Sequence, residues 1–209
     1  MRRALLTAAL VAAADAAAAE VIRRDIQFSL GSAATNFDYT ITAPGGTFTG
    51  SDGFEQAWRT RLGTRWALSA PGWTLAPVVG ADLTYRSASY ADGGGLTAMG
   101  VAATLGGAWA VDDRWSTDLE LALAFERADL DIQAGSGLAG SGNMRGSDMR
   151  GRVLYLLDRS WSAGIELGWE VASGSYSASG QREVTIDSAG WSAALLLVWR
   201  LSMRPAGLE

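Results

Sequence analysis

Arginine and carboxylate side chains recur at alternate positions in several segments of this sequence. Alternate positions share one face of a β-strand, so this spacing predicts strands with one charged face. Arginine can hold a carboxylate in bidentate geometry, and paired charges satisfy one another where a lone buried charge would be expensive. The set on this parity balances seven acids against seven arginines: Glu55, Arg59, Arg61, Arg65, Asp82, Arg86, Asp118, Glu120, Glu126, Arg150, Arg152, Glu166, Glu170 and Arg200.

Two roles fit such a charged face. One is a structural ion-pair network that plugs the interior of a barrel. The other is a polar permeation path, in which the three arginines of 59–65 would form an anion-selecting ladder. The same arginines could instead pair with Glu120, Glu166 and Glu170, and Arg59 with Glu120 is one pairing that the sequence suggests.

Acid–base catalysis is the least supported function. The sequence has no His and no Cys, which removes the usual general base, thiolate nucleophiles, disulfides and thiolate metal sites. Asp112 and Asp113 are better explained by a turn, and Asp129 and Asp131 by a soluble loop than by a calcium site. The stretch Gly135–Gly146 lacks the Lys and the following helix of a phosphate loop. We therefore expect no enzyme, no catalytic residue, no cofactor and no metal.

The elements that must position these charges are clearest in Leu96–Arg127, which predicts two strands joined by a turn at Val111–Trp115. In its second strand, large apolar residues alternate strictly with Ser, Asp, Glu and Ala. Six further segments alternate in the same way, which predicts eight strands in all: Asp25–Ala33, Phe54–Ala70, Trp73–Arg86, Asp148–Leu157, Trp161–Val171 and Ala189–Met203.

The predicted connections differ in length. Those after the second, fourth and sixth strands are about three residues long and the others run from about nine to about twenty, as in membrane barrels with short periplasmic turns. Asn36–Gly53 suggests a hairpin beyond the strand ends, whereas Ala128–Ser147 and Ser173–Ser188 are predicted to be loops. An even strand number places both termini on the side of the short turns.

Alternation alone does not decide which face points outward. A soluble lipocalin-like barrel would enclose the apolar face, but a full set of Leu, Trp and Phe would overfill the interior of eight strands. Tryptophans next to the short turns favour the opposite arrangement, because they predict an interfacial belt on an outward apolar face. The predicted girdle is Trp66, Trp73, Trp109, Trp115, Tyr155, Trp161 and Trp199.

The N-terminus reads as an export signal. Met1–Arg3 is basic, Ala4–Ala14 is apolar but too short to span a bilayer, and Ala17–Ala19 offers a small-residue cleavage site before Glu20. We therefore expect a cleaved signal peptide at 1–19 and a barrel domain at 20–209. The net charge of -5 and the lack of a basic patch argue against nucleic acid as a partner.

The signal peptide, eight alternating strands, aromatic belt and charged lumen resemble the small outer-membrane barrels of the OmpA transmembrane-domain and OmpX type, over residues 22–203. Such proteins usually end in an aromatic residue, whereas here Met203 is followed by Arg204–Glu209. The resemblance implies an all-β, eight-stranded antiparallel up-and-down barrel in the outer membrane of a Gram-negative bacterium. It also implies periplasmic termini, extracellular long loops, and outer-membrane lipid and the barrel-assembly machinery as partners.

The sequence thus predicts a monomeric membrane barrel with an occluded, charge-paired lumen and a structural role. Aromatic and apolar residues in the predicted loops, Phe37, Tyr39 and Tyr176 among them, would either contact an unknown surface ligand or pack on one another above the barrel. The alternatives are a small porin-like channel, a soluble lipocalin-like binding barrel and, least favoured, an outer-membrane enzyme.

Overall fold

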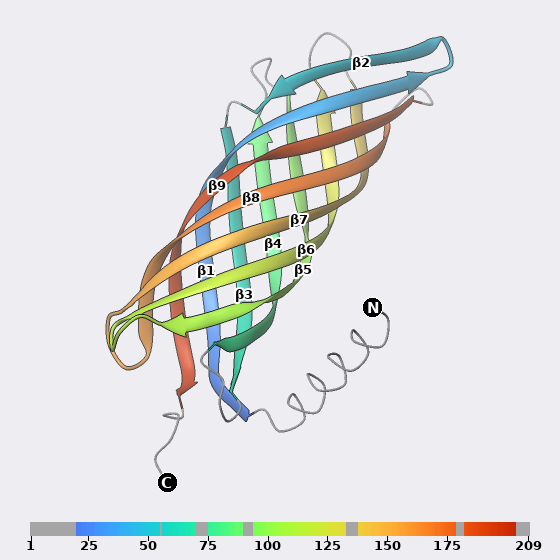
Figure 1. Cartoon of the computed structure of the whole chain (residues 1–209). Helices are drawn as coiled ribbons and strands as arrows, with labels where there is room; N and C mark the ends of the chain where they lie inside the picture. Colours follow the sequence, from blue (N-terminus) through green and yellow to red (C-terminus); the bar gives the residue numbers. More distant parts are fainter. Residues whose placement is uncertain are drawn as a thin grey trace, which may run out of the picture.

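The fold is a closed antiparallel β-barrel (Figure 1). The computed structural model describes residues 20–54, 56–69, 75–89, 94–132, 138–178 and 182–203. Within these ranges no helix is long and apolar enough to cross a membrane. The strands are β1 (Glu20–Ala43), β2 (Gly46–Gly53), β3 (Gln56–Ser69), β4 (Ala76–Ser89), β5 (Gly95–Ala110), β6 (Trp115–Ile132), β7 (Leu138–Leu156), β8 (Trp161–Ala178) and β9 (Arg182–Met203).

Eight of these strands form the barrel wall, as the sequence predicts. β1 and β3–β9 pair in chain order, and β1 then pairs with β9, so the sheet closes without a free edge. β1 begins and β9 ends at one end of the barrel, where Arg23 lies opposite Met203 and where the turns at 111–114 and 157–160 also lie. We call this the turn end and the opposite one the hairpin end.

The remaining strand, β2, pairs with β1 alone among the described strands and makes the hairpin that the sequence predicts. Asn36 lies opposite Gly53 at its base, and Ala43 opposite Gly46 at its tip. Gly46 has a φ of 144°, a conformation that a side chain would oppose, so glycine suits this tight turn. In Figure 1 the hairpin runs past the rim of the barrel.

The predicted long loops are largely wrong. β6 and β7 extend through most of Ala128–Ser147, and β8 and β9 extend through most of Ser173–Ser188. β1 likewise continues well beyond the predicted Asp25–Ala33. Gly, Ser and Asp have low intrinsic strand propensity, but pairing with neighbours on both sides overrides it here. The wall at the hairpin end is therefore built of polar strands rather than of loops.

The turns at 111–114 and 157–160 share one device. Asp112 Oδ1 accepts hydrogen bonds from the backbone amides of Arg114 and Trp115, both at 2.7 Å. Asp158 Oδ1 accepts from the amides two and three residues further on, at 2.7 and 2.8 Å. The two donated amide bonds hold the pKa of Asp112 below its usual range. Asp112 therefore has the turn role that the sequence assigns to it.

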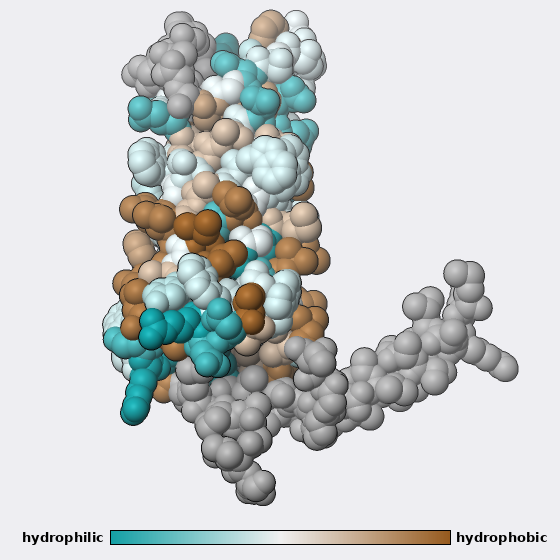
Figure 2. Space-filling view, turned by 60° about the vertical axis from the view of Figure 1, so that its left-hand side comes forward, coloured by the Kyte–Doolittle hydropathy of each residue, from teal (hydrophilic) through white to brown (hydrophobic). Residues whose placement is uncertain are grey.

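The apolar faces of the strands point outward. Leu121 is 60% exposed and Leu197 is 43% exposed, whereas Ala102 on the other parity is 3% exposed. On the face in view, Figure 2 shows the result as a hydrophobic band across the middle of the barrel, with more polar surface towards either end. The soluble lipocalin-like alternative required the apolar parity inside, so it is wrong.

Arginine in place of Leu121 or Leu197 should lower the unfolding free energy in lipid vesicles by about 2–4 kcal/mol, because the guanidinium would lie in hydrocarbon. Urea titration followed by tryptophan fluorescence measures this. Asp113→Arg, in an exposed turn, is the control and should change the free energy by less than about 0.5 kcal/mol. Equal tolerance of all three substitutions would contradict a lipid-facing band.

Candidate functional site

The interior of the barrel is filled in three layers. At the turn end lie two small apolar clusters, one of Ala67, Val78 and Ala108 and one of Leu154, Leu196 and Val198. A charged layer occupies the middle. The hairpin end holds a larger apolar cluster, here called the apolar cap: Phe37, Ala88, Leu96, Ala98, Ala128, Leu130, Met144, Ala172, Tyr176, Val184 and Ile186.

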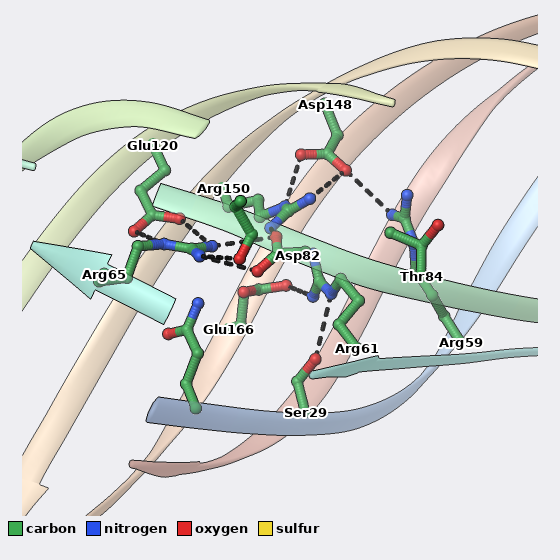
Figure 3. Close-up of polar contacts among 12 residues, drawn as sticks. Ser29, Arg59, Arg61, Arg65, Asp82, Thr84, Glu120, Asp148, Arg150 and Glu166 are labelled. Atoms are coloured by element: carbon green, nitrogen blue, oxygen red, sulfur yellow. Dashed lines mark hydrogen bonds and ion pairs between the residues drawn. The ribbon is translucent and has the colours of Figure 1, made fainter. Parts of the chain in front are cut away.

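Arg65 on β3 is the most completely paired cation of the charged layer (Figure 3). Its Nη1 and Nη2 donate to the two carboxylate oxygens of Asp82 on β4 at 2.7 and 3.0 Å. Its Nε and Nη2 donate to the two oxygens of Glu120 on β6 at 2.9 and 3.0 Å. One guanidinium therefore makes two bidentate pairs, the strongest geometry open to arginine.

Two arginines of β7 extend this pairing across the layer. Arg150 Nη1 donates to Asp82 Oδ2 at 2.9 Å, and Arg150 Nε and Nη2 lie 2.5 and 2.9 Å from the oxygens of Asp148. Arg152 Nη2 contacts Asp118 at 3.0 Å and also pairs with Glu120. Each acid thus bridges arginines of different strands, so the pairs form one connected network.

The part of the charged layer nearest the hairpin end is also paired. Arg59 contacts Asp148 at 3.1 Å and forms an ion pair with Glu170. Arg86 lies 2.8 Å from Glu126 and 3.4 Å from Glu170. These contacts connect the network to the base of the apolar cap.

Arg61 and Glu166 form a more self-contained pair. Arg61 Nη2 donates to Glu166 Oε1, and its Nε donates to Ser29 at 3.1 Å. No other ion pair involves either residue among the described side chains. Because each member makes only this one ion pair within the described residues, the pair is the simplest place to measure what lumenal pairing contributes.

The described lumen contains eight acids and eight arginines. The structure places thirteen of the fourteen predicted charges in the lumen, whereas Glu55 lies outside the described residues. Sequence reasoning missed Arg23, Asp25 and Asp148, although Asp148 shares the parity of Arg150. Arg23 contacts Asp25 at 2.8 Å, and Arg200 lies directly opposite Asp25 on β9.

The suggested pairing of Arg59 with Glu120 is wrong. Arg59 pairs with Asp148 and Glu170, whereas Glu120 pairs with Arg65 and Arg152. The reason lies in position along the strands, because Arg59 is closer to the hairpin end than Glu120 is. The balance of charge matters more than any one pair, since every described lumenal acid has an arginine within ion-pair distance.

The aromatic residues outside the barrel form two belts. Near the turns, the rings of Trp115 and Tyr155 lie 4.8 Å apart and those of Trp161 and Trp199 lie 6.0 Å apart. Trp109 is exposed nearby, Trp66 is half-buried, and Trp73 lies outside the described residues. Nearer the hairpin end is a second belt that sequence reasoning missed: Trp58, Trp169 and Trp191.

The two belts bound the apolar band. Trp161 and Trp169 on β8 are separated by about 27 Å of strand, or about 20 Å along the axis at a tilt of about 40°, near the apolar height of outer-membrane barrels. The same spacing separates Trp191 from Trp199 on β9. On each of these adjacent strands two tryptophans lie eight residues apart, and this spacing could have predicted the second belt from the sequence.

Comparisons with known proteins identify the fold. No family profile matches the sequence, and no curated protein matches it. Among solved structures, outer membrane protein OprG from Pseudomonas aeruginosa has 13% identity and a TM-score of 0.50, with 85% of this chain and 96% of that chain covered. Neisserial surface protein A has 12% identity and a TM-score of 0.47, with 81% and 95% covered. Outer membrane protease OmpT from Escherichia coli has 8% identity and a TM-score of 0.44, with 86% and 97% covered.

The chain thus has the fold of the small eight-stranded outer-membrane barrels. This confirms the resemblance to barrels of the OmpA transmembrane-domain and OmpX type at the level of fold. At 13% identity the likeness shows the fold alone.

Replacing one partner of the Arg61–Glu166 pair should be more harmful than replacing both. Arg61→Met or Glu166→Leu alone should cost about 3–5 kcal/mol of unfolding free energy, because each leaves a buried charge unpaired. The double variant should cost clearly less than the sum. Urea unfolding of the four proteins in one double-mutant cycle measures the coupling, and additive single effects would contradict a buried pair.

Two glycines test whether the charged layer is tightly packed. A Cβ at Gly63 would collide with Asp82 Oδ1 and lie 2.8 Å from the carbonyl oxygen of Ala81. Gly63→Ala should therefore destabilise the protein by about 1–3 kcal/mol. Gly151 faces outward with nothing within 4 Å of a Cβ, so Gly151→Ala is the matched control and should be close to neutral. Equal unfolding midpoints for both variants would show that the lumen has spare room.

Proposed function

We propose that this chain is an integral outer-membrane barrel with an occluded lumen and a structural role. The hairpin end faces outside the cell, and the turn end, with both termini, faces the periplasm. The observation that carries the proposal is the combination of an outward apolar band between two aromatic belts and a lumen filled by paired charges. Hydrocarbon offers no hydrogen bonds, so a closed barrel with this exterior suits a bilayer.

Occlusion rests on the layering of the interior. Between the charged layer and the apolar cap, a lumenal cavity lined by Arg59, Arg86, Glu170 and Tyr176 has a volume of only about 30 Å³. That is room for about two or three water molecules. The apolar cap then closes the hairpin end. A solute would have to disrupt both ion pairs and apolar packing, so a structural plug is favoured over a porin-like path.

A surface-interaction role falls to the β1–β2 hairpin. Phe37 and Tyr176 are buried in the apolar cap, so they are not free to contact a partner. Phe48 on β2 is 61% exposed, and its ring lies 6.1 Å from that of Tyr39. The hairpin therefore presents the apolar and aromatic surface that an unknown surface ligand would contact.

The proposal includes no catalytic activity. The eight described lumenal carboxylates are held by arginines, so none is positioned to move a proton to a substrate. Residues 1–19 lie outside the described structure and are proposed to be an export signal removed before insertion. Insertion as a monomer by the barrel-assembly machinery completes the proposal.

The membrane placement is tested by electrophoresis of detergent-extracted protein with and without boiling. A folded membrane barrel should be β-rich and should change its mobility on heating, because the closed sheet resists detergent until it is heated. Complete solubility of the folded chain without detergent would refute the proposal.

Conductance in a planar bilayer tests the occlusion. The unmodified protein should show rare or no openings. Arg59→Ala with Arg65→Ala should change this little, because the apolar cap still closes the barrel. Adding Met144→Ala and Ile186→Ala, which thins the cap, should produce measurable openings, with preserved heat-modifiable mobility as the folding control. A large, steady conductance from the unmodified protein would instead make a solute channel the leading function.

A further inference from the structure

A groove crosses the outer wall of the barrel near the hairpin end. Its volume is about 870 Å³, and it runs over β6, β7, β8, β9 and β1. Two registered rows of outward residues line it. The row nearer the turn end passes from Leu123 through Ser147 to Val171. The row nearer the hairpin end passes from Phe125 through Arg145 to Ser173.

The hollow arises from the sizes of these side chains. Ser147, Ser173 and Ala189 are small, so the surface falls to the backbone at Gly146 and Ala172. The larger Phe125 and Trp169 stand at its sides. A groove of this size takes part of an acyl chain and a headgroup rather than a single ion.

The groove lies where the wall changes from apolar to polar. One row nearer the turn end, the outward residues are Leu121, Met149, Trp169 and Trp191. One row nearer the hairpin end they are Arg127, Asn143, Ser175 and Thr185. A molecule seated in the groove would therefore touch apolar surface with one part and polar surface with the other.

Opposite charges lie at different points along the groove row that is nearer the hairpin end. Asp38 and Asp187 are directly opposite each other on β1 and β9, and Ser173 separates Asp187 from Arg145. The backbone distance from Asp187 to Arg145 is thus two strand spacings, or about 10 Å. None of the three charged side chains has an ion pair with another described residue, unlike the lumenal charges.

We propose that this groove binds a zwitterionic phospholipid, one whose headgroup carries a phosphate and an ammonium group. Arg145 and the Ser173 hydroxyl would hold the phosphate, and Asp38 and Asp187 would hold the ammonium. The acyl chain would lie against Leu123, Phe125 and Trp169. An anionic lipid lacking the ammonium would leave two carboxylates next to each other without a counter-charge. This site rests on the membrane placement proposed above.

Native mass spectrometry of the detergent-solubilised, delipidated protein tests the site with equimolar phosphatidylethanolamine and phosphatidylglycerol as probes. The protein should retain one phosphatidylethanolamine about tenfold more tightly, as expected for one added charged contact. Arg145→Gln and Asp38→Asn with Asp187→Asn should remove this preference. Arg159→Gln and Asp113→Asn, which change exposed charges of the turns at the opposite end of the barrel, should leave it unchanged. Ser173→Trp fills the groove and should abolish retention of both lipids.

Equal retention of the two lipids by the unmodified protein would overturn the site. Retention that survives Ser173→Trp would do the same, as would displacement of phosphatidylethanolamine by lipid A with Mg²⁺. A separate measurement, folding into phosphatidylcholine vesicles judged by heat-modifiable mobility, tests the membrane placement itself. Protein that inserts there but shows no lipid preference refutes the groove alone, whereas protein that never inserts refutes the placement and the groove together.

Discussion

The pairing of β1 with β9 is the constraint on which the rest of the structure depends. Once these strands join, every strand has two neighbours, and alternate residues must point either into a narrow lumen or outward. Because a full set of leucines would overfill that lumen, the strict alternation of β6 then has one solution, with leucines outside and acids inside. The same closure keeps backbone polar groups paired throughout the wall, which an open sheet in hydrocarbon could not do.

Closure also creates an energetic problem that the lumen solves. Sixteen charges in a space only as wide as their side chains must be paired, because an unpaired buried ion loses its hydration without replacement. Arginine suits this position since its planar fork serves two acids at once, as Arg65 does with Asp82 and Glu120. Glycines such as Gly63 leave room for these long side chains. The apolar clusters on either side separate the ion pairs from water, which strengthens them.

The period-two pattern was enough to predict the eight-stranded barrel, its outward face and most of the charged layer. Exceptions to this pattern were harder to predict. Leu154, for example, is an apolar residue on the inward face of β7, where it packs against Leu196 and Val198. The strands within 128–147 were missed because Gly and Ser give no alternating apolar pattern. Their pairing partners lie elsewhere in the chain and could not be recognised from this segment alone. The sequence suggested Glu120, Glu166 and Glu170 as partners of the three β3 arginines, and each does pair with one of them. Which acid pairs with which arginine could not be predicted, because these partners lie on non-adjacent strands, where neither spacing nor register between neighbours applies.

The network also has a consequence for the order of folding. The three arginines of β3 pair with acids 55, 105 and 111 residues later in the chain. Arg59 and Arg61 on β3 reach Glu170 and Glu166 on β8 only once the wall has curved round to bring these non-adjacent strands across the lumen, so until then these cations must be hydrated. These cross-lumen ion pairs therefore form only when the wall closes, which links barrel closure to dehydration of the lumen in one late, cooperative step. Contacts of such long range favour slow folding, and they make a half-formed barrel wet inside until the end.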